Sequence, residues 1–477
     1  MRLPVDLPVA QRALAFAALA EGRSELLHVP QADSLDSALA LWRALGVTLD
    51  ETADAIAIEG VGLHGLRMPS GALDCGRSWE ALALLAGVLG GQYFGTRLTV
   101  HPSLAARSVE HIVGPLRARG AHIAGRAGTD ERTLPSIAVA PLVGAERLLA
   151  LDASLPYADS DAKSAVLMSA LFAAGATTIS EPTISADHTE RLLVALGLPL
   201  RRVGTVVAFD PSAWDRRLPA LGRIELPGST TIAAYLAVAA QLLPGSDITL
   251  RGVGINPTRS GALEVLRQWG GPLRVAARPD AALREPLADM RVSSAVRPGE
   301  RQNAAAAAAL RGGVIGGELL VRARDEVPAI ALLGAATRRG ARLCDLGWLE
   351  SEPDPEWLAL DALFAAFGLV TQRSPGELIL ASADTSPGAR LALATGARDI
   401  PSDAPRRESS DASRRESIDA PRRVDARDDP RLSLCACTLG LASPGVTVVE
   451  HAARALRAVY PGFLEVARAL GAEIEFV

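Results

Sequence analysis

Arginine is almost the only cation that this sequence offers for binding anions or moving protons. Of the 49 lysines and arginines, 48 are arginines and Lys163 is the single lysine. A guanidinium holds a phosphate or carboxylate with a fork of hydrogen bonds, but its pKa above about 12 prevents it from giving up a proton during a reaction. Proton transfer therefore falls to carboxylates and histidines, and anion binding to arginines and hydroxyl groups.

The stretch LDCGRSWEALALLAG, residues 73–87, has the order of elements of an anion-binding helix entrance. A strand end and a glycine turn precede an apolar helix, and the free N–H groups at a helix start attract anions. Trp79 and Glu80 occupy the beginning of that helix. An indole crowds a backbone that glycine would let a ligand approach, and a carboxylate repels phosphate. The stretch therefore predicts a helix entrance without an anion cradle.

Two polar strings precede further helices. SADHTERLLVALG (185–197) places Asp187 and Glu190 at the spacing of a capping box, which predicts a helix that begins after Asp187. GINPTRSGALEVLRQWGG (254–271) offers a helix entrance at 256–258, because proline suits the first turn of a helix. We expect mainly structural roles for both strings, and a hydrogen-bonded structural role for His188.

One pattern recurs six times along the chain: an apolar helix, a turn, a β-branched strand, and an amphipathic helix that ends at glycine. These glycines lie at 46, 120, 197, 270, 368 and 471, with spacings of 74, 77, 73, 98 and 103 residues. Glycine is a frequent helix C-cap, and the spacings exceed the roughly 20–50 residues of ordinary solenoid repeats. We therefore expect an α/β (α+β) fold of six small βαβαβ subdomains.

The last interval contains a low-complexity insert at 398–429. Its repeats DAPRRESS, DASRRESI and DAPRRVDA mix acidic and basic residues and carry almost no apolar side chains. Burial of such a segment cannot offset the entropy lost on ordering. We expect a disordered or weakly helical segment that is a tolerated loop insertion rather than a docking tail.

The composition indicates a folded protein of two or three domains that acts on small molecules or serves as a scaffold. The chain has 477 residues, 49% of them hydrophobic, and a net charge of −5. That charge does not attract nucleic acid or an anionic membrane, and no apolar run reaches the roughly 18 residues of a membrane span. The cysteines, at 75, 344, 435 and 437, lack the spacing of a zinc site or a disulfide framework, so we expect a cytoplasmic protein.

With the six repeats, the strings LDCG, DHTER and NPTRSG resemble the 5-enolpyruvylshikimate-3-phosphate synthases more than the UDP-N-acetylglucosamine enolpyruvyl transferases. The resemblance covers nearly the whole chain apart from the insert. It implies the two-domain enolpyruvyl transferase fold, in which each domain packs three units around inward helices and two crossover strands join the domains. The first domain would comprise residues 9–223, and the second 1–8 and 224–477. Family members usually have a further strand before residue 1.

The family reaction joins the 5-hydroxyl of shikimate 3-phosphate to carbon 2 of phosphoenolpyruvate and expels phosphate through a tetrahedral intermediate. Two phosphates and a carboxylate must be gathered in one cleft, which requires several cations and hydroxyl donors. The resemblance implies no cofactor and no metal. We expect a monomer whose partners, if it is active, are these two anionic substrates, without nucleic acid or membrane.

Six positions match residues that the family uses in this reaction. Asp325 corresponds to the carboxylate that handles the sugar hydroxyl, although it could instead pair with Arg322 or Arg324. Arg107 corresponds to the arginine that binds phosphoenolpyruvate, and its other interpretation is a solvated arginine near a helix start. The remaining substrate-binding candidates are Arg12, Ser160, Ser185 and Arg431.

The lysines of the family site are missing. They fall on Leu7, Glu352 and Ala458, and Lys163 falls at an ordinary helix position. The loop 352–356 reverses the family's charge and contains two prolines, and Asp159 and Asp161 flank Ser160 with two carboxylates where the family has none.

Three functions remain open from these residues. The first is a divergent synthase, with Arg12, Arg107 and Arg431 as anion clamps, Ser160 and Ser185 as phosphate donors, and Asp325 as base. The second is a non-catalytic family member that acts as a binding protein or scaffold, which the missing lysines favour. The third is a transferase with a different, less anionic acceptor, whose altered pocket Trp79, Glu80 and Tyr157 would line.

Overall fold

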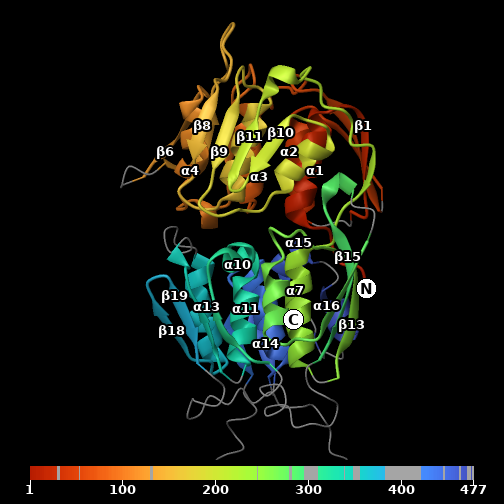
Figure 1. Ribbon diagram of the computed structural model, residues 1–477, viewed down its shortest axis with the longest axis vertical. Coiled ribbons are helices and arrows are strands. Elements are labelled where there is room, and N and C mark those ends of the chain that lie inside the picture. Colours follow the sequence, from red (N-terminus) through yellow and green to blue (C-terminus); the bar gives the residue numbers. More distant parts are fainter. Residues whose placement is uncertain are drawn as a thin grey trace, which may run out of the picture.

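The computed structural model describes residues 1–29, 33–52, 54–128, 133–243, 245–278, 282–294, 310–337, 339–347, 355–381, 421–443, 446–460, 463–469 and 474. The chain forms two bodies along its longest axis (Figure 1). One hydrophobic cluster holds residues from Val5 to Leu226, and another holds Leu3 and residues from Ile232 to Ala467. We call these bodies the first half (residues 5–226) and the second half (residues 1–4 and 227 onward). The predicted domain boundaries stay a prediction, which this division supports to within a few residues.

Helices and strands alternate through the first half. Its elements are α1 (Leu7–Leu19), β1 (Glu21–Leu27), α2 (Asp33–Ala44), β2 (Thr48–Glu51), β3 (Ala55–Val61), β4 (Leu73–Asp74), α3 (Trp79–Leu89), β5 (Thr96–Thr99), α4 (Glu110–Ala118), β6 (Ile123–Ala127), β7 (Thr133–Val139), β8 (Leu151–Ser154), α5 (Ser160–Ala170), β9 (Thr177–Ser180), α6 (His188–Ala195), β10 (Leu200–Val203), β11 (Val206–Phe209) and β12 (Arg223–Glu225).

The second half repeats the alternation. Its elements are α7 (Thr230–Leu242), β13 (Asp247–Gly254), α8 (Gly261–Gln268), β14 (Leu273–Ala277), β15 (Leu287–Ser293), β16 (Gly313–Ile315), α10 (Glu318–Val321), α11 (Val327–Ala335), β17 (Ala341–Leu343), α13 (Pro355–Ala366), β18 (Thr371–Ser374), β19 (Glu377–Leu380), β20 (Arg422–Asp425), α14 (Pro430–Leu441), β21 (Thr447–Glu450), α15 (Ala453–Val459) and α16 (Phe463–Ala469). Short 3-10 helices include Ala282–Arg284 and Arg324–Glu326.

Four sheets share one strand arrangement. Their orders are β12-β1-β3-β2, β4-β5-β7-β6, β8-β9-β11-β10 and β16-β17-β19-β18. In each, the first two strands are parallel and the last two form an antiparallel hairpin. The sheets β13-β15-β14 and β20-β21 complete six units within the described residues. The predicted α/β fold of repeated units is confirmed, and four of the units have one strand more than the predicted βαβαβ.

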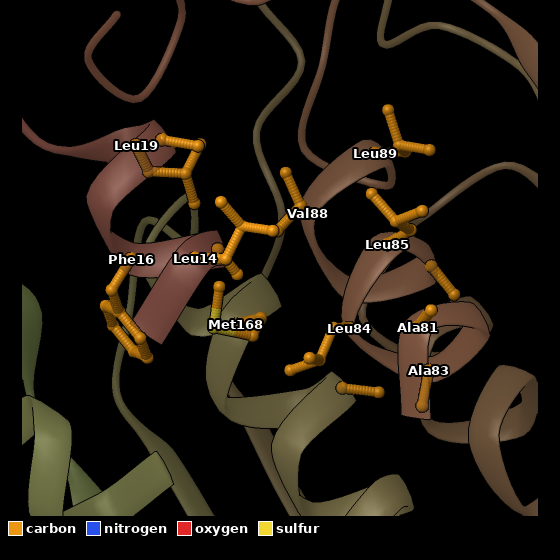
Figure 2. Packing of buried hydrophobic residues seen from close by; sticks show 14 of the residues in the cluster. Leu14, Phe16, Leu19, Ala81, Ala83, Leu84, Leu85, Val88, Leu89 and Met168 are labelled. Carbon is orange, nitrogen blue, oxygen red and sulfur yellow. The ribbon is translucent and has the colours of Figure 1, made fainter. Parts of the chain in front are cut away.

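The first helix of each unit is buried on nearly all sides. Helices α1, α3 and α5 pack together in the first half, where Leu14, Leu84 and Met168 lie in one cluster (Figure 2). A helix that is apolar all round must be enclosed by its neighbours, which the Ala/Leu-rich sequences predict. Helices α3 and α5 approach closely at Gly87, where a Cβ atom would lie 2.3 Å from the carbonyl oxygen of Ala165. Helices α7, α11 and α14 occupy the corresponding place in the second half.

The predicted insert ends earlier than expected. Residues 398–420 lie outside the described part of the chain, but β20 pairs in parallel with β21, and Asp429 caps α14 through a hydrogen bond from the Leu432 amide at 2.7 Å. The disorder predicted up to residue 429 is therefore wrong for residues 422–429, because Val424 is buried and the backbone gains a partner strand. No helix in the described residues is long and apolar enough to cross a membrane.

Candidate functional site

Arg12 is enclosed where α1, α3, α5 and α6 meet. Its side chain is 1% exposed, and every nitrogen of the guanidinium has a protein partner. The partners are Thr189 Oγ1 (3.1 Å), the Pro8 carbonyl (2.9 Å), Glu80 Oε1 (2.9 Å), Ser164 Oγ (3.2 Å) and Asp161 Oδ1 (3.5 Å). The arginine predicted to hold a substrate anion thus holds two carboxylates of its own chain.

A carboxylate also occupies the start of α5. Asp159 Oδ1 accepts hydrogen bonds from the amides of Asp161 (2.9 Å) and Ala162 (3.1 Å). These are the N–H groups that an anionic ligand would use at a helix N-terminus, so Asp159 fills that position itself. Ser160 begins the helix, and its carbonyl accepts a hydrogen bond from Ser164 Oγ at 2.6 Å.

Asp161 titrates near neutral pH. Burial and the nearby charges of Glu80 and Asp159 raise the pKa of its carboxyl to about 7, against the attraction of Arg12 and Arg107. Adding an anion next to these three carboxylates would be opposed by the same repulsion.

Aromatic side chains fill the space beside this cluster. The ring of Trp79 stacks on the ring of His111, with centroids 6.1 Å apart and planes inclined by 23°. The ring centroid of Tyr157 lies 6.0 Å from that of His111. Arg107 lies over the indole face of Trp79 at 4.2 Å, in cation–π geometry. His111 Nε2 is 3.3 Å from Asp159 Oδ2, and both side chains are buried. Arg107 is partly buried, so it is not the fully solvated arginine of the alternative interpretation, and its role in binding phosphoenolpyruvate stays a prediction.

Lys163 is a buried structural cation, not an ordinary helix position. Its Nζ lies 2.9 Å from Glu181 and 2.8 Å from Glu190, and it donates to the Ser185 carbonyl at 3.3 Å. Burial opposes its charge, but the two glutamates outweigh burial and raise the pKa of Lys163, so it keeps its proton. Ser185 Oγ is buried and has no hydrogen-bond partner among the described residues.

Asp325 forms an ion pair with Arg259, a partner that the sequence did not suggest. Its Oδ2 lies 3.1 Å from Arg259 Nη2, and 43% of the side chain is exposed. Burial opposes ionisation of this carboxyl, but Arg259, then Arg431 and Arg324, outweigh burial and lower the pKa of Asp325. Asp325 is therefore an ionised group and a weak base.

The pKa of Glu326, the next residue, is shifted in the opposite direction. Burial raises its pKa to about 7, with help from Asp325, although Arg259 opposes the shift. Its Oε1 accepts a hydrogen bond from Thr231 Oγ1 at 2.5 Å, and Oε2 has no partner among the described residues. The remaining candidate, Arg431, lies at the start of α14 with Nε 3.9 Å from Asp429.

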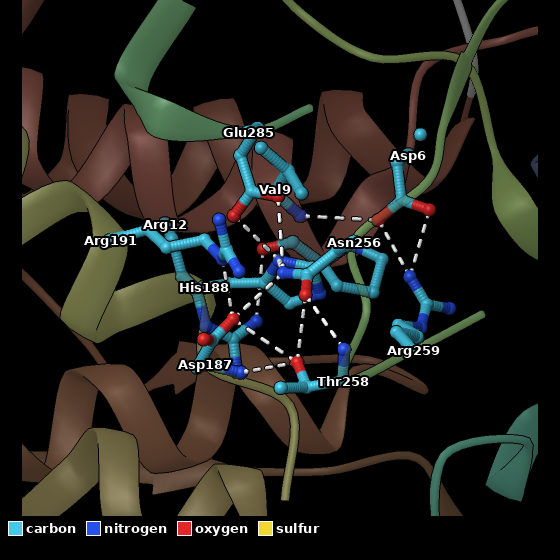
Figure 3. A network of polar contacts seen from close by, with 12 residues as sticks. Asp6, Val9, Arg12, Asp187, His188, Arg191, Asn256, Thr258, Arg259 and Glu285 are labelled. Atoms are coloured by element: carbon cyan, nitrogen blue, oxygen red, sulfur yellow. Dashed lines mark hydrogen bonds and ion pairs between the residues drawn. The ribbon is translucent and has the colours of Figure 1, made fainter. Parts of the chain in front are cut away.

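The two polar strings join the halves (Figure 3). Asp187 Oδ1 accepts hydrogen bonds from Asn256 Nδ2 (2.9 Å), Thr258 Oγ1 (3.1 Å) and Arg191 Nε (2.6 Å). The predicted capping box at α6 is wrong, because these partners engage Asp187 and Lys163 engages Glu190. The predicted helix start after Asp187 agrees with α6, which begins at His188.

Two further contacts across the same boundary involve His188 and Arg259. His188 Nδ1 lies 2.8 Å from Glu285 Oε1, so the predicted structural role for this histidine has a partner in the second half. Arg259 Nη1 donates to both carboxylate oxygens of Asp6, at 2.7 and 2.8 Å. Among the described residues, no three His, Cys, Asp or Glu side chains group in a way that could hold a metal ion.

The arrangement matches known proteins over its whole length. The model of the family described as EPSP synthase (3-phosphoshikimate 1-carboxyvinyltransferase) matches residues 1–324. A 3-phosphoshikimate 1-carboxyvinyltransferase of Methylococcus capsulatus is 31% identical over 476 residues, which cover 100% of this chain and 95% of that protein. The protein of the same name from Alkalilimnicola ehrlichii is 37% identical over 72% of this chain and 71% of its own.

The chain belongs to the EPSP synthase family.

Solved structures agree. The EPSP synthase of Acinetobacter baumannii superimposes with a TM-score of 0.73 at 27% identity, covering 98% of this chain and 95% of that one. The enolpyruvyl transferase NikO from Streptomyces tendae has a TM-score of 0.66 at 17% identity, covering 100% of this chain and 95% of NikO. At that identity the likeness to NikO shows the fold alone.

Within this EPSP synthase fold, the predicted site residues form two groups. Arg12, Arg107 and Ser160 gather around Asp161, and Ser185 adjoins them through Lys163. Asp325 and Arg431 lie in the second half. The halves meet near both groups, where Arg324 Nη1 donates to the Ala158 carbonyl at 3.5 Å. Most of the altered loop 352–356 lies outside the described residues.

Sequence reasoning missed three residues that dominate this region. His111 stands four positions after Arg107, a spacing that places both near one helix start, and Glu326 follows Asp325 directly. Arg259 belongs to the string NPTRSG, whose local pattern predicts a helix entrance but no ion pair. Each of these residues stands in a recognisable local sequence pattern. None of the patterns indicates which side chain the residue contacts in the folded protein.

Proposed function

We propose that this chain is a non-catalytic member of the EPSP synthase family that acts as a binding protein or scaffold. The observation that carries the proposal is the complete engagement of Arg12 by protein groups, two of them carboxylates. The family's reaction needs cations that are available to phosphates and a carboxylate, and this cation is not available.

The contacts of Arg12 make the binding of a phosphate there unfavourable. A phosphate that approached Arg12 would displace Glu80 or Asp161 and then lie beside Asp159, within a set of carboxylates that already repel one another. Each charge-assisted hydrogen bond that a ligand fails to gain is worth about 1.5–3 kcal/mol. Lost at several positions, these bonds would weaken binding by several orders of magnitude.

The side chains considered for proton transfer are also poorly suited to that role. Lys163 is held between two glutamates, and the other lysine positions carry Leu7, Glu352 and Ala458. Asp325 is ionised with a lowered pKa, which weakens it as a base. These features support retention of the fold after loss of carboxyvinyl transfer.

The direct test is phosphate release from phosphoenolpyruvate and shikimate 3-phosphate by the purified full chain, with the Methylococcus capsulatus protein as positive control. We expect no release above background and no rescue of a cell that lacks its own synthase. Thermal unfolding with each substrate should show no stabilisation. Turnover comparable to that of the control would overturn the proposal.

A transferase with a less anionic acceptor is the second candidate. It is favoured by the aromatic rings of Trp79, His111 and Tyr157, which lie beside a His–Asp pair. Such an enzyme still needs phosphoenolpyruvate as donor. Stabilisation by phosphoenolpyruvate alone, reduced in Trp79→Ala, would favour this candidate over the scaffold.

We further propose a cytoplasmic monomer. Its four cysteines are free thiols, as a reducing compartment requires. Sedimentation of the full chain at its monomer mass over a range of concentrations would test the oligomeric state, and fractionation of cells would test the compartment.

A further inference from the structure

A cavity of about 480 Å³ lies where the two halves are connected, apart from the Arg12 and Asp325 groups. Its volume is within the range of small-molecule sites. It is lined by Met1, Arg2, His28, Glu225, Thr249, Arg251 and Arg278.

Residues of both halves and of both chain connections form the wall of this cavity, which we call the hinge cavity. His28 follows β1 of the first half, and Glu225 ends β12, which pairs with β1 in the register Leu27 with Glu225. Arg2 lies on the N-terminal connection and forms an isolated parallel bridge with Arg251 of β13. An occupant would therefore contact residues of both halves and of both chain connections.

A β-bulge sets Arg251 at the cavity. The β13–β15 ladder breaks after Leu250 and resumes at Val253, and Gly252 has a positive φ of 67°. The Gly252 amide donates instead to Asp289 Oδ1 at 2.9 Å. Bulges often re-aim a side chain beside a functional site. Here the bulge accompanies an exposed Arg251 in the cavity wall.

The wall of the hinge cavity carries more positive than negative charge. Three arginines face one carboxylate, that of Glu225, which pairs with Arg2 and lies 3.4 Å from Arg278. Arg278 has a second partner in Asp289 at 2.9 Å. The guanidinium of Arg251 forms no hydrogen bond or ion pair with the described residues. The wall thus retains positive charge and one arginine with unused donors.

We propose that the hinge cavity binds a small, multiply charged phosphate-bearing anion. Guanidinium groups bind phosphate oxygens through paired, charge-assisted hydrogen bonds, and the three arginines converge on one concave space. Because the wall includes residues of both halves, the anion also stabilises their arrangement. This site is independent of the function proposed for the interface around Arg12.

Calorimetric titration of the full chain with inorganic pyrophosphate tests the proposal. Arg251→Gln should weaken binding at least about tenfold, the loss expected for one charge-assisted contact. Glu225→Gln should tighten binding, because it removes the carboxylate that occupies Arg2 and Arg278. The matched control is Arg274→Gln on neighbouring β14, exposed and outside the cavity wall, which should leave affinity unchanged.

Two outcomes would overturn the proposal. One is the absence of pyrophosphate binding at millimolar concentration in both the parent chain and Glu225→Gln. The other is an equal loss of affinity in Arg251→Gln and Arg274→Gln, which would indicate general attraction to surface arginines. Thermal unfolding without ligand checks that each variant is folded, and pyrophosphate should stabilise the parent and Arg274→Gln more than Arg251→Gln.

Discussion

Arg12 and Arg259 are two buried arginines that the molecule surrounds with carboxylates, one within the first half and one at its boundary with the second. Arg12 pairs with Glu80 and Asp161, whose side chains are 23% and 20% exposed. Arg259 pairs across the boundary with Asp6, which is 2% exposed, and within its own half with Asp325.

The two clusters differ in the exposure of their carboxylates and in the parts of the chain that they connect. Around Arg12, partly exposed carboxylates engage the guanidinium, so in the proposed function this cluster closes the place where an anion would bind. Around Arg259, a deeply buried bidentate pair links the N-terminal connection to the second half. A cation is available to a ligand only where the chain does not neutralise it, as at Arg251.

The largest effect should follow Arg259→Met. It leaves Asp6 and Glu326 buried without their cation, and breaking a buried pair in this way costs about 3–5 kcal/mol of unfolding free energy. Urea unfolding measures the loss. The matched control Arg267→Met, exposed on α8, should change stability by no more than about 0.5 kcal/mol.

Arg12→Met should cost less, about 1–3 kcal/mol, because Glu80 and Asp161 can reach water or take up a proton once the arginine is gone. The exposed Arg97→Met on β5 is the control in the same half. Equal losses for Arg12→Met and Arg259→Met would contradict the distinction drawn between the two clusters.

Each cluster also contains one carboxyl whose pKa is raised to about 7, Asp161 in the first and Glu326 in the second. The folded state then holds protons that the unfolded chain releases from about pH 4, so stability should fall as pH rises from about 4 to about 7. Asp161→Asn and Glu326→Gln should each flatten that fall. Unfolding curves across this range that match the parent would show that neither group titrates as described.

The smallest effect on stability should come from Glu80→Thr, about 0.5–1 kcal/mol for one partly exposed ion pair. This change frees one donor of Arg12 and introduces a hydroxyl at the helix entrance. Weak stabilisation by phosphoenolpyruvate should appear in Glu80→Thr and be smaller in Glu80→Gln, which retains a bulky side chain. Strong binding by the parent chain would instead show that Glu80 does not block the site.

Much of the architecture could be predicted because its signals are local. Glycine-terminated helices revealed six units, and helices rich in alanine and leucine revealed which of them face inward, since helix periodicity and capping depend on neighbouring residues. The hairpin that adds a fourth strand to four units was missed, as was the β20 strand at the end of a low-complexity insert. Pairing with a distant strand decides both, and composition does not report it.

The amino-acid sequence by itself determined the family and the presence of a single lysine, because residue identity needs no coordinates. Only the tertiary structure decided how the surviving groups are used: Arg12 meets Glu80 across 68 residues, Asp187 bonds Asn256 instead of capping its own helix, and Arg2, Glu225 and Arg251 meet at one cavity. The energy of a charge depends on its burial and on its partners, and folding sets both.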